Sequence, residues 1–202
     1  MTLIVGTTNS AKIDQVRGAL KSLNLDIQGL PERDFPAIEE NGLTALENAR
    51  IKAIFYSALI GLPVLSTDNA LYFDDLTTEK QPGLNVRRIK GQNDRVSDAE
   101  LLTYYSSLIK ELGDKVNGYW EFGICLAYPD SNIKEIIIKS PRIFVSHPSP
   151  KITEGYPLDS IQINPETNQY ISEMTIEEQG DFWQKTIGKE LCSFIKECLI
   201  SK

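Results

Sequence analysis

The sequence predicts an α/β fold with a mixed β-sheet. Short apolar segments of strand length alternate along the chain with longer segments whose apolar residues repeat at helical spacing, and this alternation is typical of α/β domains. Two long apolar segments, residues 119–128 and 133–145, are separated only by the turn sequence PDSN. We expect them to form a β-hairpin, which requires some antiparallel pairing in the sheet.

Six apolar segments have the length and the residue types of strands. In chain order, the predicted strands are residues 2–6, 25–30, 64–66, 71–73, 119–128 and 133–145. Pro31 follows the second strand and ends it, because proline cannot donate a hydrogen bond to a neighbouring strand. The third and fourth strands lie on either side of Asp68, so this carboxylate is expected at a strand end or in the turn between the two.

Four segments with apolar residues at helical spacing are predicted as helices. They begin at Ser10, Thr44, Ser97 and Lys185, and their expected ends are near Leu23, Gly61, Leu112 and Ile200. Thr44 and Ser97 are each followed three residues later by a glutamate, which is the pattern of a capping box. The polar segment 77–94 contains the turn sequences PG and GQND, and we expect it to be a mobile loop.

Length and composition indicate one soluble globular domain spanning residues 1–202. The hydrophobic share of 41% and the charged share of 24% are ordinary for such a domain. No apolar segment approaches the ~20 residues that span a membrane, and the first ten residues lack the basic start of a signal peptide. The net charge of −7 argues against a nucleic-acid polymer as partner. A single nucleotide needs only two or three local cations and is compatible with this charge.

The cysteine and histidine content argues against several kinds of site. The three cysteines, Cys125, Cys192 and Cys198, form no CxxC pair. We expect them to be buried, reduced thiols, which indicates a cytoplasmic protein. His147, in the loop sequence SHPSP, is the only histidine, and a lone histidine is more often a surface residue than a catalytic base. The sequence therefore argues against a Ser-His-Asp enzyme and against a zinc–histidine enzyme.

The sequence GTTNSAK, residues 6–12, connects the first predicted strand to the first helix and suits a bound phosphate. A strand that turns into a helix leaves backbone N–H groups unpaired, and such groups attract anions. The side chains that add donors or charge are those of Thr7, Thr8, Asn9 and Lys12. The segment is not a Walker loop, which has two glycines before its lysine and a hydroxyl residue after it. The alternative interpretation is that Ser10 only caps the helix and Lys12 is solvated.

Several carboxylates near the predicted strand ends could hold magnesium, which binds one or two carboxylates together with water and phosphate oxygens. The candidates are Glu39, Glu40, Glu47, Asp68, Asp74 and Asp75. Asp68 is the best placed, because a strand would deliver it to a binding cleft. There it could bind the metal and orient or deprotonate an attacking water. The alternative is that Asp68 and Asn69 form a plain turn, where both residue types are common.

Four sequence motifs together resemble the inosine triphosphate pyrophosphatase (ITPase) family. They are GTTNSAK, ENGLTALENARIKA, LPVLSTDNAL and PGLNVRR, in this order within residues 1–88, with a weaker match in GYPLDSIQINPETNQYISEMT. The resemblance implies an elongated mixed sheet with flanking helices, two lobes around a central cleft, and a homodimer. It also implies magnesium-dependent hydrolysis of non-standard purine nucleoside triphosphates to a monophosphate and pyrophosphate.

The resemblance implies roles for the residues at the matching positions. The phosphate chain of the substrate would be bound by Thr7, Thr8, Asn9, Lys12 and Lys52. Asp68 would be the general base and, together with Glu40, a metal ligand. Further substrate contacts would come from Asn69, Arg88, Gly155, Tyr156 and Lys185. In this scheme the cations neutralise the phosphates, and a carboxylate with magnesium activates water.

The chain departs from the family pattern in three places. Thr67 stands where the family has an additional aspartate. Glu154 and Pro157 stand where the family has an aromatic residue and an aspartate that hold the purine. The late serine-histidine-arginine motif is absent, and its nearest equivalents are Gln184 and Lys185. The end of the site that binds phosphate is thus retained, whereas the end that recognises the base is changed.

The leading hypothesis is therefore a divergent family member, a magnesium-dependent nucleoside triphosphate pyrophosphatase with altered base selectivity. A first alternative is an enzyme that acts on another nucleotide or phosphate ester. A second alternative is a catalytically silent relative that binds a nucleotide or a protein. Retention of Lys12, Lys52 and Asp68 favours an active enzyme, whereas the changed purine end favours the alternatives.

Overall fold

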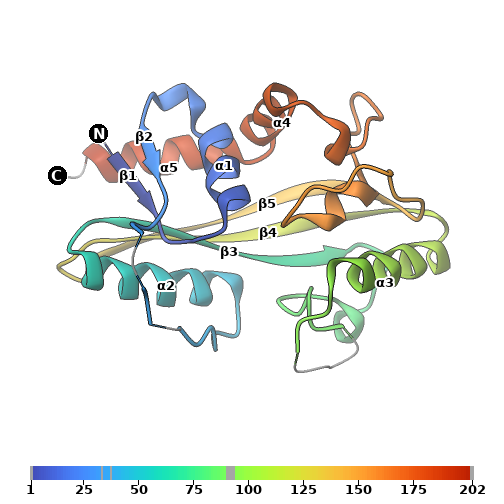
Figure 1. The fold of residues 1–202 in the computed structure, drawn as a ribbon, viewed down its shortest axis with the longest axis horizontal. Coiled ribbons are helices and arrows are strands. Elements are labelled where there is room, and N and C mark those ends of the chain that lie inside the picture. Colours follow the sequence, from blue (N-terminus) through green and yellow to red (C-terminus); the bar gives the residue numbers. More distant parts are fainter. Residues whose placement is uncertain (1, 33, 37, 90–93, 201–202) are drawn as a thin grey trace. The chain divides into compact units, whose positions relative to one another are not determined.

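The computed structural model describes residues 2–32, 34–36, 38–89 and 94–200, and it confirms the predicted α/β class with a mixed sheet (Figure 1). The strands of the described part are β1 (Thr2–Val5), β2 (Asp26–Gln28), β3 (Val64–Phe73), β4 (Lys115–Ala127), β5 (Ile133–Val145) and β6 (Gln162–Ile163). The α-helices are α1 (Ser10–Ala19), α2 (Ala45–Ile60), α3 (Asp98–Glu111), α4 (Ile176–Trp183) and α5 (Lys189–Ile200). The strands form one sheet in the order β2-β1-β3-β4-β5-β6.

Parallel and antiparallel pairs both occur in this sheet. β1 pairs in parallel with β2 and with β3, whereas β6 pairs antiparallel with β5. β4 and β5 are neighbours joined by a tight turn, in which the Tyr128 N–H donates to the Asn132 carbonyl over 2.9 Å. This turn confirms the predicted hairpin. Because β1 ends at Val5 opposite Leu65, the loop that follows β1 begins beside the first residues of β3.

The chain divides into two compact units. Unit 1 comprises Met1–Asn69, Glu121–Lys139 and Gly180–Lys202, and unit 2 comprises Ala70–Trp120 and Ser140–Gln179. Strands β3, β4 and β5 contribute residues to both units. A single domain over residues 1–202 and a central cleft stay predictions.

The structure contradicts the prediction of two short strands around Asp68. Residues 64–66 and 71–73 belong to one continuous strand, β3, and Asp68 lies in its middle rather than at a strand end or in a turn. Aspartate and asparagine are depleted in strands, so the sequence pattern indicated a break. The contacts that the Asp68 carboxylate makes with other elements compensate for this low strand propensity, as described below.

Other element boundaries also differ from the prediction. Asn9 caps α1 in place of Ser10, because its Oδ1 accepts the Ala11 N–H over 3.0 Å. Ile176 starts α4, which leads through the π-helical segment Gln184–Gly188 into α5. The polar residues of α4 hide its helical pattern in the sequence. Strand β4 begins at Lys115 instead of residue 119, and β6 is too short to give a sequence pattern.

The starts of α2 and α3 agree with their predicted capping residues. The Thr44 hydroxyl accepts the Glu47 N–H over 3.1 Å, and Ser97 with Glu100 forms a complete capping box. Gly61 follows α2 in the left-handed conformation, with φ of 70°, which glycine adopts at little cost. Among the described residues, no helix is both long enough and apolar enough to cross a membrane.

The polar segment 77–94 contains some regular structure. Thr78–Lys80 form a 3₁₀ turn, and Gly83 makes an antiparallel bridge with Leu71. Residues 90–93 lie outside the described residues, and the mobility of the segment stays a prediction.

Unit 1 packs helices on two sides of its strands. α2 lies on one side of β3–β5, and α1 and α5 lie on the other (Figure 1). α1 approaches the C-terminal helical segment closely, because a Cβ atom on Gly188 would lie 2.5 Å from the Ala19 carbonyl oxygen. The three cysteines, Cys125, Cys192 and Cys198, are free and buried, as predicted.

Unit 2 has its own apolar core, which includes one side of α3. The buried residues of α3 are Leu101, Tyr105 and Ile109. They belong to a cluster that also contains Phe73 and Phe144, whose ring centroids are 4.9 Å apart. The Tyr105 hydroxyl donates to the Val86 carbonyl over 3.2 Å and thereby satisfies its buried polar end.

Two opposite charges are buried in unit 2. The exposed fractions of Arg142 and Asp159 are 3% and 6%. Arg142 donates to the Ser140 hydroxyl over 2.6 Å, and Asp159 accepts from Gln162 Nε2 over 3.2 Å. Burial raises the pKa of Asp159 to about 7, although the positive charge of Arg142 opposes this shift. Asp159 therefore keeps its proton in the folded protein at pH values where an exposed aspartate has lost it.

We predict that Asp159 makes the folded protein less stable as the pH rises from about 4 to about 7, the range between its ordinary and its raised pKa. In this range the folded state binds more protons than the unfolded state, so the free energy of unfolding falls as the pH rises. Asp159→Asn cannot titrate and should lose less stability across the range than the wild type. Urea unfolding at several pH values measures both slopes, and equal slopes would contradict the prediction.

Candidate functional site

The Asp68 carboxylate is the centre of a charged cluster in unit 1. Its Oδ1 lies 3.3 Å from Lys52 Nζ and 3.9 Å from Lys12 Nζ. Its Oδ2 accepts a hydrogen bond of 3.0 Å from Asn48 Nδ2. A carboxylate in the middle of a strand would lose hydration, and these three partners offset that loss.

Helix α2 supplies two of these partners from one face. Asn48 and Lys52 are four residues apart, so they lie on the same side of the helix, one turn from each other. The exposed fractions of Asn48 and Lys52 are 4% and 8%. Burying an ammonium removes its hydration, and the negative charge of Asp68 offsets part of that cost.

The side-chain amide of Asn48 makes hydrogen bonds to two different segments of the chain. Its Oδ1 accepts the Gly42 N–H over 2.9 Å, and its Nδ2 donates to Asp68. These two contacts determine the orientation of the amide group. The sequence hypothesis missed Asn48, although its spacing of four residues from Lys52 would have indicated it once the buried face of the helix was known.

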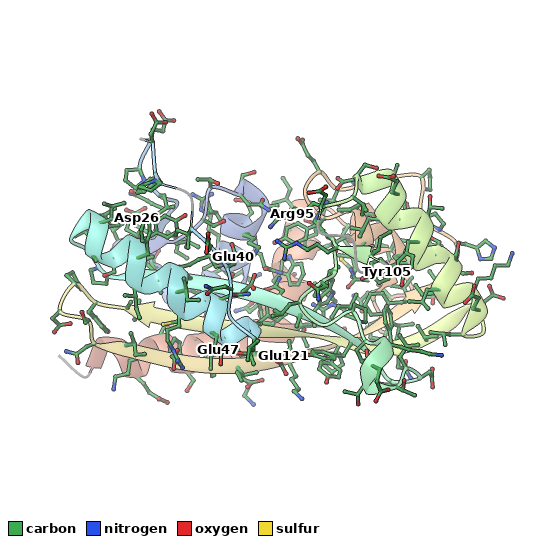
Figure 2. All side chains as sticks on the ribbon, turned by 90° about the horizontal axis from the view of Figure 1, so that it is seen from below. Asp26, Glu40, Glu47, Arg95, Tyr105 and Glu121 are labelled. Atoms are coloured by element: carbon green, nitrogen blue, oxygen red, sulfur yellow. The ribbon has the colours of Figure 1, made fainter. Side chains whose placement is uncertain are left out.

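Glu40 provides the second negative charge next to Lys52. Its Oε2 lies 3.5 Å from Lys52 Nζ, so this ammonium lies between the carboxylates of Glu40 and Asp68. Figure 2 shows Glu40 beside α2 and Glu47 near the start of that helix. Glu47 is used in capping, because its Oε2 accepts the Leu43 N–H over 2.6 Å. A role for Glu47 as a metal ligand would require it to lie in the charged cluster. Its contact with Leu43 places it in the helix cap instead.

The remaining candidate carboxylates have no described contact with this cluster. Glu39 is exposed, and Asp74 and Asp75 are exposed residues of unit 2 that follow the end of β3. The cluster in unit 1 thus contains the predicted pair of carboxylates, Glu40 and Asp68, and the two predicted lysines.

The loop from β1 to α1 brings Lys12 to the cluster. Gly6 begins this loop against β3, because a Cβ atom there would lie 2.2 Å from Ser66 Oγ. The Thr7 hydroxyl accepts the Asn9 N–H over 3.2 Å, which shapes the turn before α1. Thr8 is exposed. The first turn of α1 then presents its N-terminal N–H groups and Lys12 together, an arrangement that favours an anion.

The two carboxylates suit a magnesium ion that is bound mainly by the substrate. Glu40 and Asp68 both lie within 3.5 Å of Lys52 Nζ and so face the same small volume. Among residues 2–32, 34–36, 38–89 and 94–200, no group of three or more acidic, histidine or cysteine side chains could hold a metal ion. Mg²⁺ takes one or two protein carboxylates and completes its shell with water and phosphate oxygens. The donor set therefore fits magnesium that is shared with a phosphate chain.

The other predicted substrate contacts lie elsewhere. In a continuous strand Asn69 faces the side opposite to Asp68, and its buried Oδ1 has no hydrogen-bond partner in the described part of the chain. Lys185 is an exposed residue of the π-helical segment in unit 1. The remaining predicted contacts, which belong to unit 2, are Arg88, Gly155 and Tyr156.

In unit 2, Arg87 rather than Arg88 contacts the turn at Gly155. Arg88 is exposed, whereas Arg87 forms an ion pair of 2.6 Å with Asp98 and donates to the Gly155 carbonyl over 3.5 Å. Gly155 has a φ of 80°, which a residue with a side chain adopts only with strain. The buried Tyr156 hydroxyl has no hydrogen-bond partner among the described residues. The structure leaves the predicted roles of these residues untested.

Comparison with known proteins supports the resemblance that the motifs indicate. A dITP/XTP pyrophosphatase of Wigglesworthia glossinidia brevipalpis is 30% identical over 198 residues, which cover 96% of each chain. A dITP/XTP pyrophosphatase of Streptococcus pneumoniae serotype 4 is 29% identical over 181 residues, which cover 88% of each chain. Both alignments therefore include most of this chain.

Solved structures show the same fold. A HAM1 protein from Coxiella burnetii superposes with a TM-score of 0.71 and 22% identity, covering 98% of this chain and 99% of that one. The Ham1 protein of Staphylococcus aureus gives a TM-score of 0.68 and 20% identity with the same coverage. The model of the Ham1 family matches residues 3–185. Together with the full-length relatives, this match shows that the chain belongs to the Ham1 family, the family of ITPase-like proteins that its motifs resemble.

Proposed function

We propose that this chain is a nucleoside triphosphate pyrophosphatase that hydrolyses non-standard purine nucleoside triphosphates, such as those of inosine and xanthosine, to a monophosphate and pyrophosphate. The observation that carries the proposal is the Asp68 carboxylate, which is held by Asn48 and lies between Lys12 and Lys52. The full-length relatives named dITP/XTP pyrophosphatases support the same reaction.

The lysines and the β1–α1 loop bind the phosphate chain in this proposal. Lys12 and Lys52 supply two positive charges next to the reacting carboxylate, and Thr7, Thr8 and Asn9 supply hydrogen-bond donors. A triphosphate carries more negative charge than either product alone, so two cations favour the substrate and the charge that develops on the leaving pyrophosphate.

Asp68 accepts a proton from the attacking water. Its Oδ2 is fixed by Asn48, while its Oδ1 faces the two lysines that would hold the phosphates. A base in this position can orient water towards a phosphorus atom of the bound chain. Glu40 and Asp68 would hold magnesium, which, when bound, supplies Lewis-acid polarisation of the phosphate oxygens.

In this proposal, as the family resemblance implies, further substrate contacts come from Gly155, Tyr156, Asn69, Arg88 and Lys185. Glu154 is exposed at the position where the family has an aromatic residue. Asp159, two residues after Pro157, does not replace the family's aspartate, because it is buried beside Arg142. The purine end is therefore the part in which this chain differs most from the family pattern.

The proposed partner is a small nucleotide rather than a nucleic-acid polymer, and the net charge of −7 supports this choice. We further propose a cytoplasmic homodimer that does not act at a membrane. The changed purine end favours one second candidate function, hydrolysis of a nucleotide with a different base. A panel of standard and modified nucleoside triphosphates, assayed for pyrophosphate release with and without Mg²⁺, tests both candidates and separates them from a silent binding protein.

Asp68→Asn should lower turnover by about 10²–10⁴-fold, because an amide can neither accept the proton nor bind the metal well. The fold should persist, since the amide still accepts the hydrogen bond from Asn48. Steady-state kinetics and a thermal melt measure the two effects. As a matched control, Asp130→Asn on the exposed β4–β5 turn should leave turnover unchanged. An Asp68→Asn enzyme with more than half of wild-type activity would show that Asp68 is not the base.

Lys12→Ala and Lys52→Ala should weaken the binding of a nucleoside triphosphate more than the binding of the monophosphate, because both lysines would contact the phosphate chain. Each charge-assisted contact is worth about 1.5–3 kcal/mol. Titration calorimetry with the two ligands measures the difference, and Lys134→Ala, an exposed lysine of β5, serves as control. Equal losses for the two ligands would place the lysines away from the phosphate chain.

We predict weak discrimination between inosine and adenosine triphosphates, because Glu154 offers no aromatic face and the family's base-reading groups are replaced. A site without matched polar groups cannot reject a mismatched base strongly. The ratio of kcat/KM for the two substrates should stay below ~100, which corresponds to about 2.7 kcal/mol. Glu154→Phe, at an exposed position, should lower KM for both. A larger ratio in favour of inosine would show that other residues have rebuilt the purine site.

A further inference from the structure

A third residue of α2 continues the face that carries Asn48 and Lys52. Tyr56 follows Lys52 by four residues and lies one helical turn further along. Its ring meets the Phe35 ring edge to face, with centroids 5.3 Å apart and an interplanar angle of 89°. It also lies against the start of the β1–α1 loop, because a Cβ atom on Gly6 would be 3.2 Å from Tyr56 Cδ2.

The segment that carries Glu40 runs along this face of α2. We refer to residues 34–36 and 38–44 as the Glu40 segment. Its contacts with α2 follow in order: Phe35 meets Tyr56, Glu40 pairs with Lys52, and the Gly42 N–H donates to Asn48. Residues further along the segment therefore contact residues closer to the start of the helix, so the segment and α2 run antiparallel.

These contacts differ in whether their residues also bind Asp68. Asn48 and Lys52 also bind Asp68, so they belong to the charged cluster itself. The contact between Phe35 and Tyr56 is made by two half-buried rings and involves no charge. It fixes the end of the Glu40 segment that is further from the helix start. Glu40 lies between this ring contact and the contacts of Gly42 and Leu43 at the other end, and its ion pair joins it to Lys52.

We propose that Tyr56 is a positioning residue that, through the ring of Phe35, holds the Glu40 segment along α2 so that Glu40 and Asp68 face the same metal ion. The inference rests on the proposed function, in which Glu40 is a metal ligand. An edge-to-face aromatic pair contributes enough to change a local equilibrium by about three- to tenfold. Because Tyr56 touches neither metal nor substrate in this proposal, its loss should change metal affinity more than the chemical step.

Tyr56→Ala and Phe35→Ala should each raise the Mg²⁺ concentration for half-maximal activity about three- to tenfold. kcat at saturating Mg²⁺ should stay within about twofold of the wild type, and the effect of the double variant should be smaller than the sum of the two single effects, because both variants remove the same ring contact. Tyr56→Phe keeps the ring and should behave as wild type. Ile54→Ala removes a partly exposed side chain from a different face of α2 and serves as the matched control.

Two measurements without turnover test the same inference. Binding of Mn²⁺ in the presence of inorganic pyrophosphate, followed by electron paramagnetic resonance, should weaken three- to tenfold in Tyr56→Ala and Phe35→Ala. Hydrogen exchange of the Gly42 and Leu43 amides, which donate to α2 side chains, should become faster in the same variants. Phe35→Ala keeps the inference testable if Tyr56→Ala fails to fold.

Three results would overturn the inference. Unchanged Mn²⁺ affinity with unchanged exchange at Gly42 and Leu43 would show that the ring contact does not hold the segment. A loss of kcat with unchanged metal dependence would give Tyr56 a direct role in the reaction. An equal defect in Tyr56→Phe would assign the effect to the hydroxyl. Absence of pyrophosphate release from every nucleotide would instead refute the proposed function, whereas hydrogen exchange would still report whether Tyr56 holds the segment.

Discussion

The candidate site depends on the ion pair between Asp68 and Lys52. Each partner is costly alone, because Asp68 lies within a strand and the exposed fraction of Lys52 is only 8%. Their pairing at 3.3 Å joins α2 to β3 and offsets both costs. Asn48 from the same helix, together with Lys12 and Glu40 from two further segments, completes the surroundings of this pair. The charges that would perform hydrolysis are thus the same charges that connect these elements.

The sequence predicted the parts of the fold that local signals determine. Helix starts at Thr44 and Ser97 follow from capping residues, and the hairpin at residues 129–132 follows from a turn sequence between two apolar segments. The continuity of β3 could not be predicted, because it depends on residues far away in the chain. Asp68 and Asn69 favour a turn by local propensity, whereas contacts of Asp68 with distant residues, among them Asn48 and Lys52, favour an extended strand there.

The difference between local sequence signals and contacts with distant residues also explains which residues of the cluster the sequence indicated. Lys12, Glu40, Lys52 and Asp68 carry charge, so the chemistry of a phosphate site points to them directly. Asn48 and Tyr56 have no charge, and their role becomes visible only when the buried face of α2 is known. The substrate contact of Asn69 is implied only by the family resemblance, and it stays a prediction. In a continuous strand, neighbouring side chains point to opposite faces.

The residues proposed for the phosphate end and the residue at the changed purine end differ in how much they contribute to stability. At the phosphate end, replacing Asp68 or Lys52 leaves its partner poorly compensated, so a substitution there lowers the stability of the fold as well as the activity. Glu154 is exposed and takes part in no comparable pair in the described part of the chain. A change at that position therefore costs little stability. A chain under these constraints can retain the phosphate site and still alter its base recognition.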